Sequence, residues 1–391
     1  MQAIDDGVYP HHSSIPARRA GLAGENYEAF QPPLYYLLAT PAYLVGGSFI
    51  TKVRAVRTFD VLLLLAAVAI LALLARAVFG KRWLIPYCMA LTVVMWPGVL
   101  IRVVTASNEA LELPMALLYV LACWRASTSR SGRWMVAAGV LLGLCLLTSP
   151  TLACLAPLLL LPVRASLRES RTRRPLLIAV LMAALPVLMI APWLASNEGR
   201  YGALTGEKIV KREQMSTINP AGQHYGGRDV VSAAWETSRA VLPQEWWQEY
   251  ARSHRAIILR ALPLLVLGLA LGALTALIWR RRSLLLRETF ILGGPYVLGM
   301  IMLGAGVLIE QWPVLLARYL NPEFTLLALL VIPRPTTRKG RTAALAGVTA
   351  VTLLVVGIWA YMTGAYLFPS LGAHFGIRAA SASVVQHVMR A

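Results

Sequence analysis

Long apolar stretches dominate this sequence and leave little choice of fold. Most approach the roughly 20 residues with which a helix crosses a hydrocarbon core of ~30 Å. Because a chain in lipid must satisfy its own backbone hydrogen bonds, these stretches are expected to be helices. The sequence predicts an all-α, polytopic integral membrane protein with about ten transmembrane helices, at residues 59–79, 84–105, 107–125, 134–149, 151–164, 174–197, 256–279, 289–309, 320–333 and 343–364. Two of these, 151–164 and 320–333, are short for a span and are expected to be re-entrant or partly broken.

The composition and charge agree with a membrane protein. Only 14% of the 391 residues are charged, against about 25% in a soluble domain. In a soluble protein the formal net charge of +19 would suggest a nucleic-acid partner. Here the basic residues lie in short segments between apolar stretches, so orientation in the bilayer explains them better. We therefore expect membrane lipids as partners and no nucleic acid.

Basic residues cluster in alternate loops and predict an orientation. Roughly half of the 37 basic residues lie near 76–82, 125–133, 164–174, 280–287 and 334–341, and short Lys/Arg-rich loops stay cytoplasmic. Three segments are then predicted to lie on the opposite, non-cytoplasmic side: residues 1–58 with an interfacial helix, a large loop at 198–255 and a tail at 365–391. Helices 1–6 occupy 59–197 and helices 7–10 occupy 256–364 in this division.

The N-terminal segment does not fit that orientation fully. Lys52, Arg54 and Arg57 lie just before the first predicted span, against the positive-inside tendency. No apolar signal segment precedes them. Either the first span inserts with its N-terminus translocated, or a helix upstream of Met1 is missing from this sequence, and we favour the second explanation.

Two polar motifs lie early in the chain, at predicted outer ends of helices. Gln-Pro-Pro-Leu-Tyr-Tyr at 31–36 begins a short aromatic helix that could bind a ligand or serve as an interfacial anchor. Ser-Asn-Glu at 107–109 places Glu109 at a helix N-terminus, where an acid could also be a simple cap. Glu112 lies one turn deeper, and an acid at that depth is functional by default.

Two further motifs lie at later outer ends. Residues 192–202 begin with a Pro-Trp pair and are predicted to run out of the membrane. Residues 318–322 read Arg-Tyr-Leu-Asn-Pro. The guanidinium of Arg318 suits a phosphate, although an arginine near the interface can also simply snorkel. No phosphate loop, dinucleotide fingerprint, HExxH or nucleophile elbow occurs. The cofactor is unknown, since no ligand spacing selects a divalent metal or any other group.

Taken together, these stretches resemble the GT-C superfamily of membrane glycosyltransferases, in the branch of bacterial protein O-mannosyltransferases and the aminoarabinose transferase of lipid A. The resemblance rests on 31–36, on Gly-x-x-x-Gly-Leu-x-x-Leu-Thr at 139–148, on 192–202 and on 318–322. It implies transfer of a sugar from a polyprenyl-phosphate donor to an unidentified acceptor, on the non-cytoplasmic face of the cell membrane. Such enzymes use an acid as general base and charged groups to hold the lipid phosphate.

The resemblance also suggests roles for individual residues. Glu109 is the candidate for a second catalytic acid, and Asp5 and Asp6 are further catalytic candidates. The residues expected to bind the substrate or the donor phosphate are Gln31, Pro32, Tyr35, Arg318 and Tyr319. In the family the catalytic acid follows the first transmembrane helix, and here that position falls before Met1. We therefore expect the first helix and its acid to be missing together. Two other functions stay open, a non-catalytic relative and a transporter or flippase for a lipid-linked or polar substrate.

Overall fold

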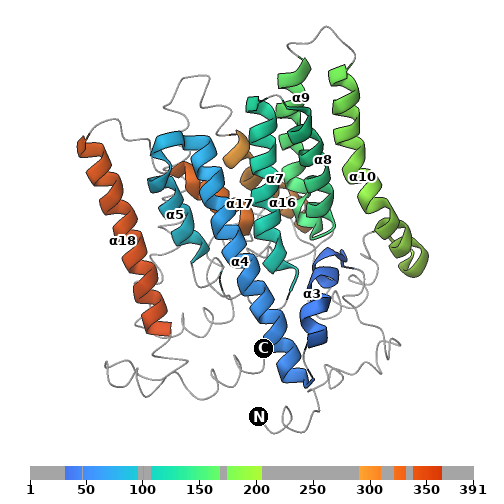
Figure 1. The fold of residues 1–391 in the computed structure, drawn as a ribbon, viewed down its shortest axis with the longest axis horizontal. Coiled ribbons are helices and arrows are strands. Elements are labelled where there is room, and N and C mark those ends of the chain that lie inside the picture. The colour runs from blue at the N-terminus through green and yellow to red at the C-terminus, as the bar shows by residue number, and fades with distance from the viewer. Residues whose placement is uncertain are drawn as a thin grey trace.

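The computed structural model describes residues 31–45, 47–95, 100, 107–129, 131–167, 174–204, 290–309, 321–331 and 338–362. Within these ranges the chain is helical and contains no strand, in agreement with the predicted all-α class. Figure 1 shows the helices packed side by side. They are α3 (Leu34–Val45), α4 (Phe49–Phe79), η2 (Gly80–Arg82), α5 (Leu84–Val94), α7 (Glu109–Ser129), α8 (Gly132–Leu146), η3 (Pro150–Leu159), α9 (Leu160–Leu167), α10 (Arg174–Tyr201), α16 (Gly294–Ile309), α17 (Asn321–Val331) and α18 (Arg338–Met362).

Three described helices are long and apolar enough to cross a membrane, judged by length and composition: Phe49–Arg82, Glu109–Ser129 and Leu177–Tyr201. Several other helices are apolar but shorter, so the predicted total of about ten spans is not established. The predicted span at 256–279 lies outside the described residues. The short stretch 151–164 consists of the 3-10 helix η3 followed by the start of α9, which fits the expectation of a partly broken segment.

Helix α4 begins well before the first predicted apolar stretch. Its N-cap is Ser48, whose Oγ accepts a hydrogen bond from the Thr51 N–H at 3.2 Å, and such a cap favours a helix start. Lys52, Arg54 and Arg57 therefore lie inside the helix and not in a preceding loop. The helix ends at Gly80, whose positive φ of 57° is a conformation that glycine adopts readily.

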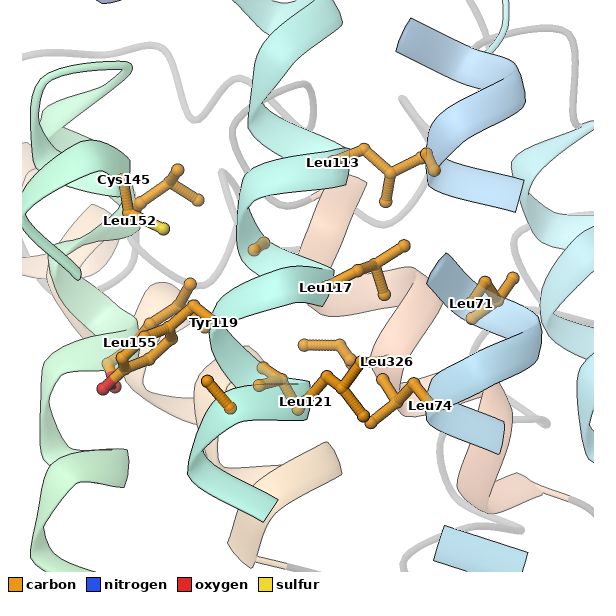
Figure 2. Packing of buried hydrophobic residues seen from close by; sticks show 14 of the residues in the cluster. Leu71, Leu74, Leu113, Leu117, Tyr119, Leu121, Cys145, Leu152, Leu155 and Leu326 are labelled. Carbon is orange, nitrogen blue, oxygen red and sulfur yellow. Dashed lines mark hydrogen bonds between the residues drawn. The ribbon is translucent and has the colours of Figure 1, made fainter. Parts of the chain in front are cut away.

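Helix α7 lies at the centre of the packing. Its most apolar 18-residue window is 89% buried, against 33% for α4 and 11% for α10. In Figure 2, Leu113 and Leu117 of α7 lie on the side that faces α4, which carries Leu71 and Leu74. Tyr119 lies on the opposite side, near Leu155 of η3. Protein therefore surrounds α7, whereas α4 and α10 present much of their apolar surface outward, as helices in contact with lipid do.

Helices α8 and α10 approach each other closely at two glycines of the 139–148 motif. A Cβ atom on Gly139 would lie 2.7 Å from the carbonyl oxygen of Met182, and one on Gly143 would lie 2.5 Å from Sδ of Met189. Small residues spaced four apart allow such contact between helix backbones in membranes. The Gly-x-x-x-Gly part of the motif therefore packs α8 against α10.

Candidate functional site

The end of α8 brings together three sequence motifs that are far apart in the chain. We call residues 147–150, which connect α8 to η3, the α8–η3 junction. The backbone carbonyl of Leu147 accepts a hydrogen bond from the Leu34 N–H at 3.0 Å, and the carbonyl of Thr148 accepts one from Asn108 Nδ2 at 3.1 Å. The last carbonyls of a helix have no intrahelical partner, so the 31–36 and 107–109 motifs occupy acceptors at the end of the 139–148 motif.

The two prolines of the first motif explain why Leu34 can reach the junction. Pro32 and Pro33 lack backbone N–H groups and have a fixed φ, so Leu34 supplies the first N–H of α3. The first N–H groups of a helix need partners outside that helix. Figure 1 shows α3 beside the ends of α7 and α8 that lie lowest in the view. Helix α3 is therefore attached to the junction by its first residue.

Gln31 and Pro32, both predicted to contact substrate, lie just before this attachment. Pro32 is buried and Gln31 is half-buried. The Gln31 side chain accepts a hydrogen bond at Oε1 from the Tyr36 hydroxyl, at 2.7 Å. Its amide nitrogen is not part of that bond, so Gln31 retains a donor group that could reach a phosphate oxygen. A role for Gln31 in binding phosphate stays a prediction.

Tyr35, also predicted to bind substrate, points into the protein. It is 1% exposed, and its hydroxyl donates a hydrogen bond to Asp60 Oδ1 at 2.9 Å. Burial and the charge of Asp60 raise the pKa of the Tyr35 phenol far above its usual value, so the hydroxyl is a neutral donor. This contact fastens α3 to α4. Asp60 is fully buried and was not predicted, although an acid inside an apolar helix is itself a signal of a specific role.

Removal of the Tyr35 hydroxyl tests this attachment. We expect Tyr35→Phe to lower the free energy of unfolding by about 2 kcal/mol, because a hydrogen bond to a charged group contributes ~1.5–3 kcal/mol. Thermal unfolding in detergent measures the effect. Tyr36→Phe is the matched control, because its hydroxyl donates an exposed hydrogen bond to Gln31 Oε1. Equal destabilisation by the two variants would contradict a specific role for the Tyr35–Asp60 bond.

Two acids lie in the first turn of α7. Glu109 is the first residue of the helix and is partly exposed, while Glu112 is 2% exposed. The helix dipole favours acids at this end. Glu109 directly follows Asn108, whose side chain bonds the junction. The structure therefore places the carboxylate predicted for catalysis next to the junction, in a position that a ligand could reach.

The segment that follows the junction contacts the residue directly after the fourth motif. Cys154 of η3 donates a hydrogen bond through Sγ to Glu323 Oε1 at 3.0 Å, and both residues are buried. Glu323 lies in the first turn of α17 and directly follows Pro322, the last residue of the 318–322 motif. Neither Cys154 nor Glu323 was predicted as part of a site.

The remaining predicted site residues are Asp5, Asp6, Arg318 and Tyr319, and they lie outside the described residues. Among the residues that are described, no group of three or more His, Cys, Asp or Glu side chains could hold a metal ion. What the described site offers chemically is a partly exposed carboxylate beside polar groups of α3 and α7. A carboxylate in such a place can take a proton from a hydroxyl group.

Comparison with known proteins gives a family match for part of the chain. Searches for similar curated proteins and for similar solved structures give no match. Residues 31–195 match the family model described as dolichyl-phosphate-mannose-protein mannosyltransferase. That range contains Leu34, Asn108, Leu147 and Thr148, which meet at the junction. The resemblance predicted from the sequence is therefore confirmed: over residues 31–195 this chain is similar to the dolichyl-phosphate-mannose-protein mannosyltransferases, and the match supports a GT-C-like membrane glycosyltransferase.

Proposed function

We propose that this protein transfers a sugar from a polyprenyl-phosphate donor to an acceptor on the non-cytoplasmic face of the cell membrane. The observation that carries the proposal is the α8–η3 junction, where the 31–36 and 107–109 motifs bond the end of the 139–148 motif. All three motifs fall within the part of the chain that matches the mannosyltransferase family. Sequence segments of this family that meet in space are good candidates for its substrate site.

The proposed reaction gives each candidate residue a task. Glu109 accepts a proton from a hydroxyl group of the acceptor, and the acceptor oxygen then bonds the anomeric carbon of the sugar. The bond between that carbon and the phosphate oxygen breaks, and the polyprenyl phosphate leaves with the electron pair. Gln31, Arg318 and Tyr319 are proposed to hold the phosphate, whose negative charge must be stabilised as it leaves.

The lipid part of the donor requires an apolar approach to the site. Helices α4 and α10 expose large aliphatic side chains, among them Leu62 and Leu188. A polyprenyl chain can lie against such surfaces within the bilayer while its phosphate reaches polar groups at the helix ends. The donor is therefore proposed to enter sideways from the membrane and not from water.

Transfer in proteoliposomes tests the proposal. The purified chain is reconstituted and supplied with polyprenyl-phosphate mannose labelled in the sugar, with a membrane extract as the source of acceptors. We expect the label to move into acceptor material that organic solvent no longer extracts with the donor. Movement of intact donor between leaflets without such a product would instead support the flippase alternative, and binding of donor without either event would support a non-catalytic relative.

A further inference from the structure

Helix α3 and the first turns of α4 expose aliphatic and basic side chains. On α3, Leu44 and Val45 are 71% and 81% exposed. On α4, the side chains of Arg54 and Arg57 are exposed. The buried faces of the two helices contact each other, so these four side chains lie outside that contact. The proposed reaction uses none of them.

Lys52 brings the aliphatic and the basic side chains together. Its Nζ lies 4.7 Å from the centre of the Tyr43 ring, a contact in which the face of an aromatic ring attracts a cation. Tyr43 directly precedes Leu44 in α3, and Lys52 lies in the first turn of α4, close to Arg54. The contact therefore places the basic start of α4 beside the exposed end of α3. We give the name α3–α4 surface to Tyr43, Leu44, Val45, Lys52, Arg54 and Arg57.

The α3–α4 surface is positively charged. Residues 31–59 contain three basic residues and no acid. The next acid, Asp60, is buried and accepts a hydrogen bond from the Tyr35 hydroxyl, so it adds no exposed negative charge. The planar guanidinium group of an arginine is suited to phosphate oxygens. The chemistry of this surface therefore fits a ligand that carries a phosphate.

The position of the arginines along α4 places them at the edge of a bilayer. From Arg57 to Arg76 the helix rises about 28 Å, close to the ~30 Å thickness of a hydrocarbon core. An arginine inside that core is unfavourable. Figure 1 shows the first turns of α4 reaching lower in the view than the ends of α5, α7 and α8. Arg54 and Arg57 therefore lie at the level of lipid headgroups when α4 spans the membrane.

The same face of α4 continues into an aliphatic stripe. Residues 54, 57, 61 and 65 are spaced three or four apart, so they lie on one face of the helix. Val61 and Leu65 are 43% and 59% exposed. A lipid whose acyl chains lie against Val61 and Leu65 therefore has its phosphate at the level of Arg54 and Arg57.

We infer that the α3–α4 surface binds the headgroups of anionic phospholipids, with Arg54 and Arg57 on the phosphate. Basic side chains beside a membrane are attracted to anionic lipids, and a helix with an aliphatic and aromatic face lies in the interface. The surface is open to bulk lipid and does not include Gln31, which is proposed to hold the donor phosphate. Binding of phospholipid also gives a reason for basic residues at an end of α4 where the positive-inside tendency disfavours them in the predicted orientation.

Photo-cross-linking of the full chain in lipid nanodiscs tests the inference. The probe is phosphatidylglycerol with a diazirine near its headgroup, and phosphatidylcholine with the same label is the neutral comparison. Mass spectrometry locates the cross-linked residues. We expect phosphatidylglycerol to label α3 and the start of α4 on the order of tenfold more than phosphatidylcholine does, because each basic side chain adds to the attraction. Equal labelling by the two lipids would overturn the inference.

The two arginines allow a graded test. Arg54→Gln combined with Arg57→Gln should reduce the excess labelling to about twofold or less, whereas Arg54→Lys combined with Arg57→Lys keeps both charges and should preserve most of it. All four substitutions are at exposed positions, so the melting temperature should stay at the wild-type value.

Lys81→Gln combined with Arg82→Gln is the matched control, because it removes two exposed charges beyond the other end of α4. Labelling of α3 and the start of α4 should then stay within about twofold of wild type. The inference is overturned if the excess survives the glutamine pair at 54 and 57, or if the control lowers it equally.

Unlabelled polyprenyl phosphate distinguishes the two sources of a lipid phosphate. It should compete with the labelled phosphatidylglycerol no better than unlabelled phosphatidylglycerol does at the same concentration. Competition about tenfold stronger would assign the surface to the glycosyl donor and overturn the inference. None of these readouts needs sugar transfer, so the lipid site and the proposed function can fail independently of each other.

Discussion

Glu109→Gln is expected to slow sugar transfer by at least about 100-fold, because a positioned general base contributes ~10²–10⁴-fold to such a step. Glutamine has nearly the same size and shape as glutamate but cannot take the proton. Glu109 is partly exposed at the start of α7, so the protein should fold normally. The loss of one favourable charge at a helix N-terminus is worth only ~0.3–1 kcal/mol.

The rate of transfer from labelled polyprenyl-phosphate mannose measures this effect. Glu198→Gln is the matched control, since Glu198 is an exposed acid near the end of α10 and outside the proposed site. Its turnover should stay within about twofold of wild type, a small effect beside the loss expected for a general base. Equal turnover of Glu109→Gln and wild type would rule out Glu109 as the base and leave Asp5 and Asp6 as the candidates.

Gly139→Leu is expected to have the largest effect on stability. Its Cβ would lie 2.7 Å from the Met182 carbonyl oxygen and 3.0 Å from the Met182 Cα, and backbone atoms in a helix cannot move aside singly. Overpacking of a tight core costs ~1–3 kcal/mol and occasionally more. A leucine forces α8 away from α10, so we expect a loss of about 3 kcal/mol or more. Gly143→Leu should cost less, because it meets the side chain of Met189, which is flexible.

Thermal unfolding of the purified variants in detergent measures the difference. Gly347→Leu is the matched control, because Gly347 lies within α18 and a Cβ there would meet nothing within 4 Å. That control should be as stable as wild type or slightly more stable, since leucine favours helices over glycine by up to ~1 kcal/mol. The close packing of α8 on α10 would be refuted if Gly139→Leu unfolded at the same temperature as the control.

The sequence predicted the helical class and several helices, because apolar length is the dominant physical requirement in a bilayer. Residues 107–125, 134–149 and 174–197 were each predicted as helices and correspond to α7, α8 and α10. The start of α4 was not predicted. The predicted apolar stretch begins only at residue 59, after the basic residues, whereas the helix reaches back to its Ser48 cap and includes Lys52, Arg54 and Arg57.

The sequence motifs of the candidate site were predicted, but the hydrogen bonds that bring them together were not. The sequence indicated that 31–36, 107–109 and 139–148 belong to one function, yet they meet through backbone carbonyls of Leu147 and Thr148. Any residue has such a carbonyl, so no residue type reveals the contact. Asp60 and Glu323 were missed for a related reason. Each is a single acid in an apolar stretch, and their partners lie 25 and 169 positions away.

The measurement that tests the central claim most directly is the stoichiometry of the reaction in proteoliposomes. Mass spectrometry can count free polyprenyl phosphate released and sugar gained by the acceptor from the same sample. The proposed function predicts one polyprenyl phosphate for each sugar transferred, and neither product beyond background with Glu109→Gln. Donor that stays intact while acceptor material gains no sugar, in a preparation whose helices unfold cooperatively, would contradict it.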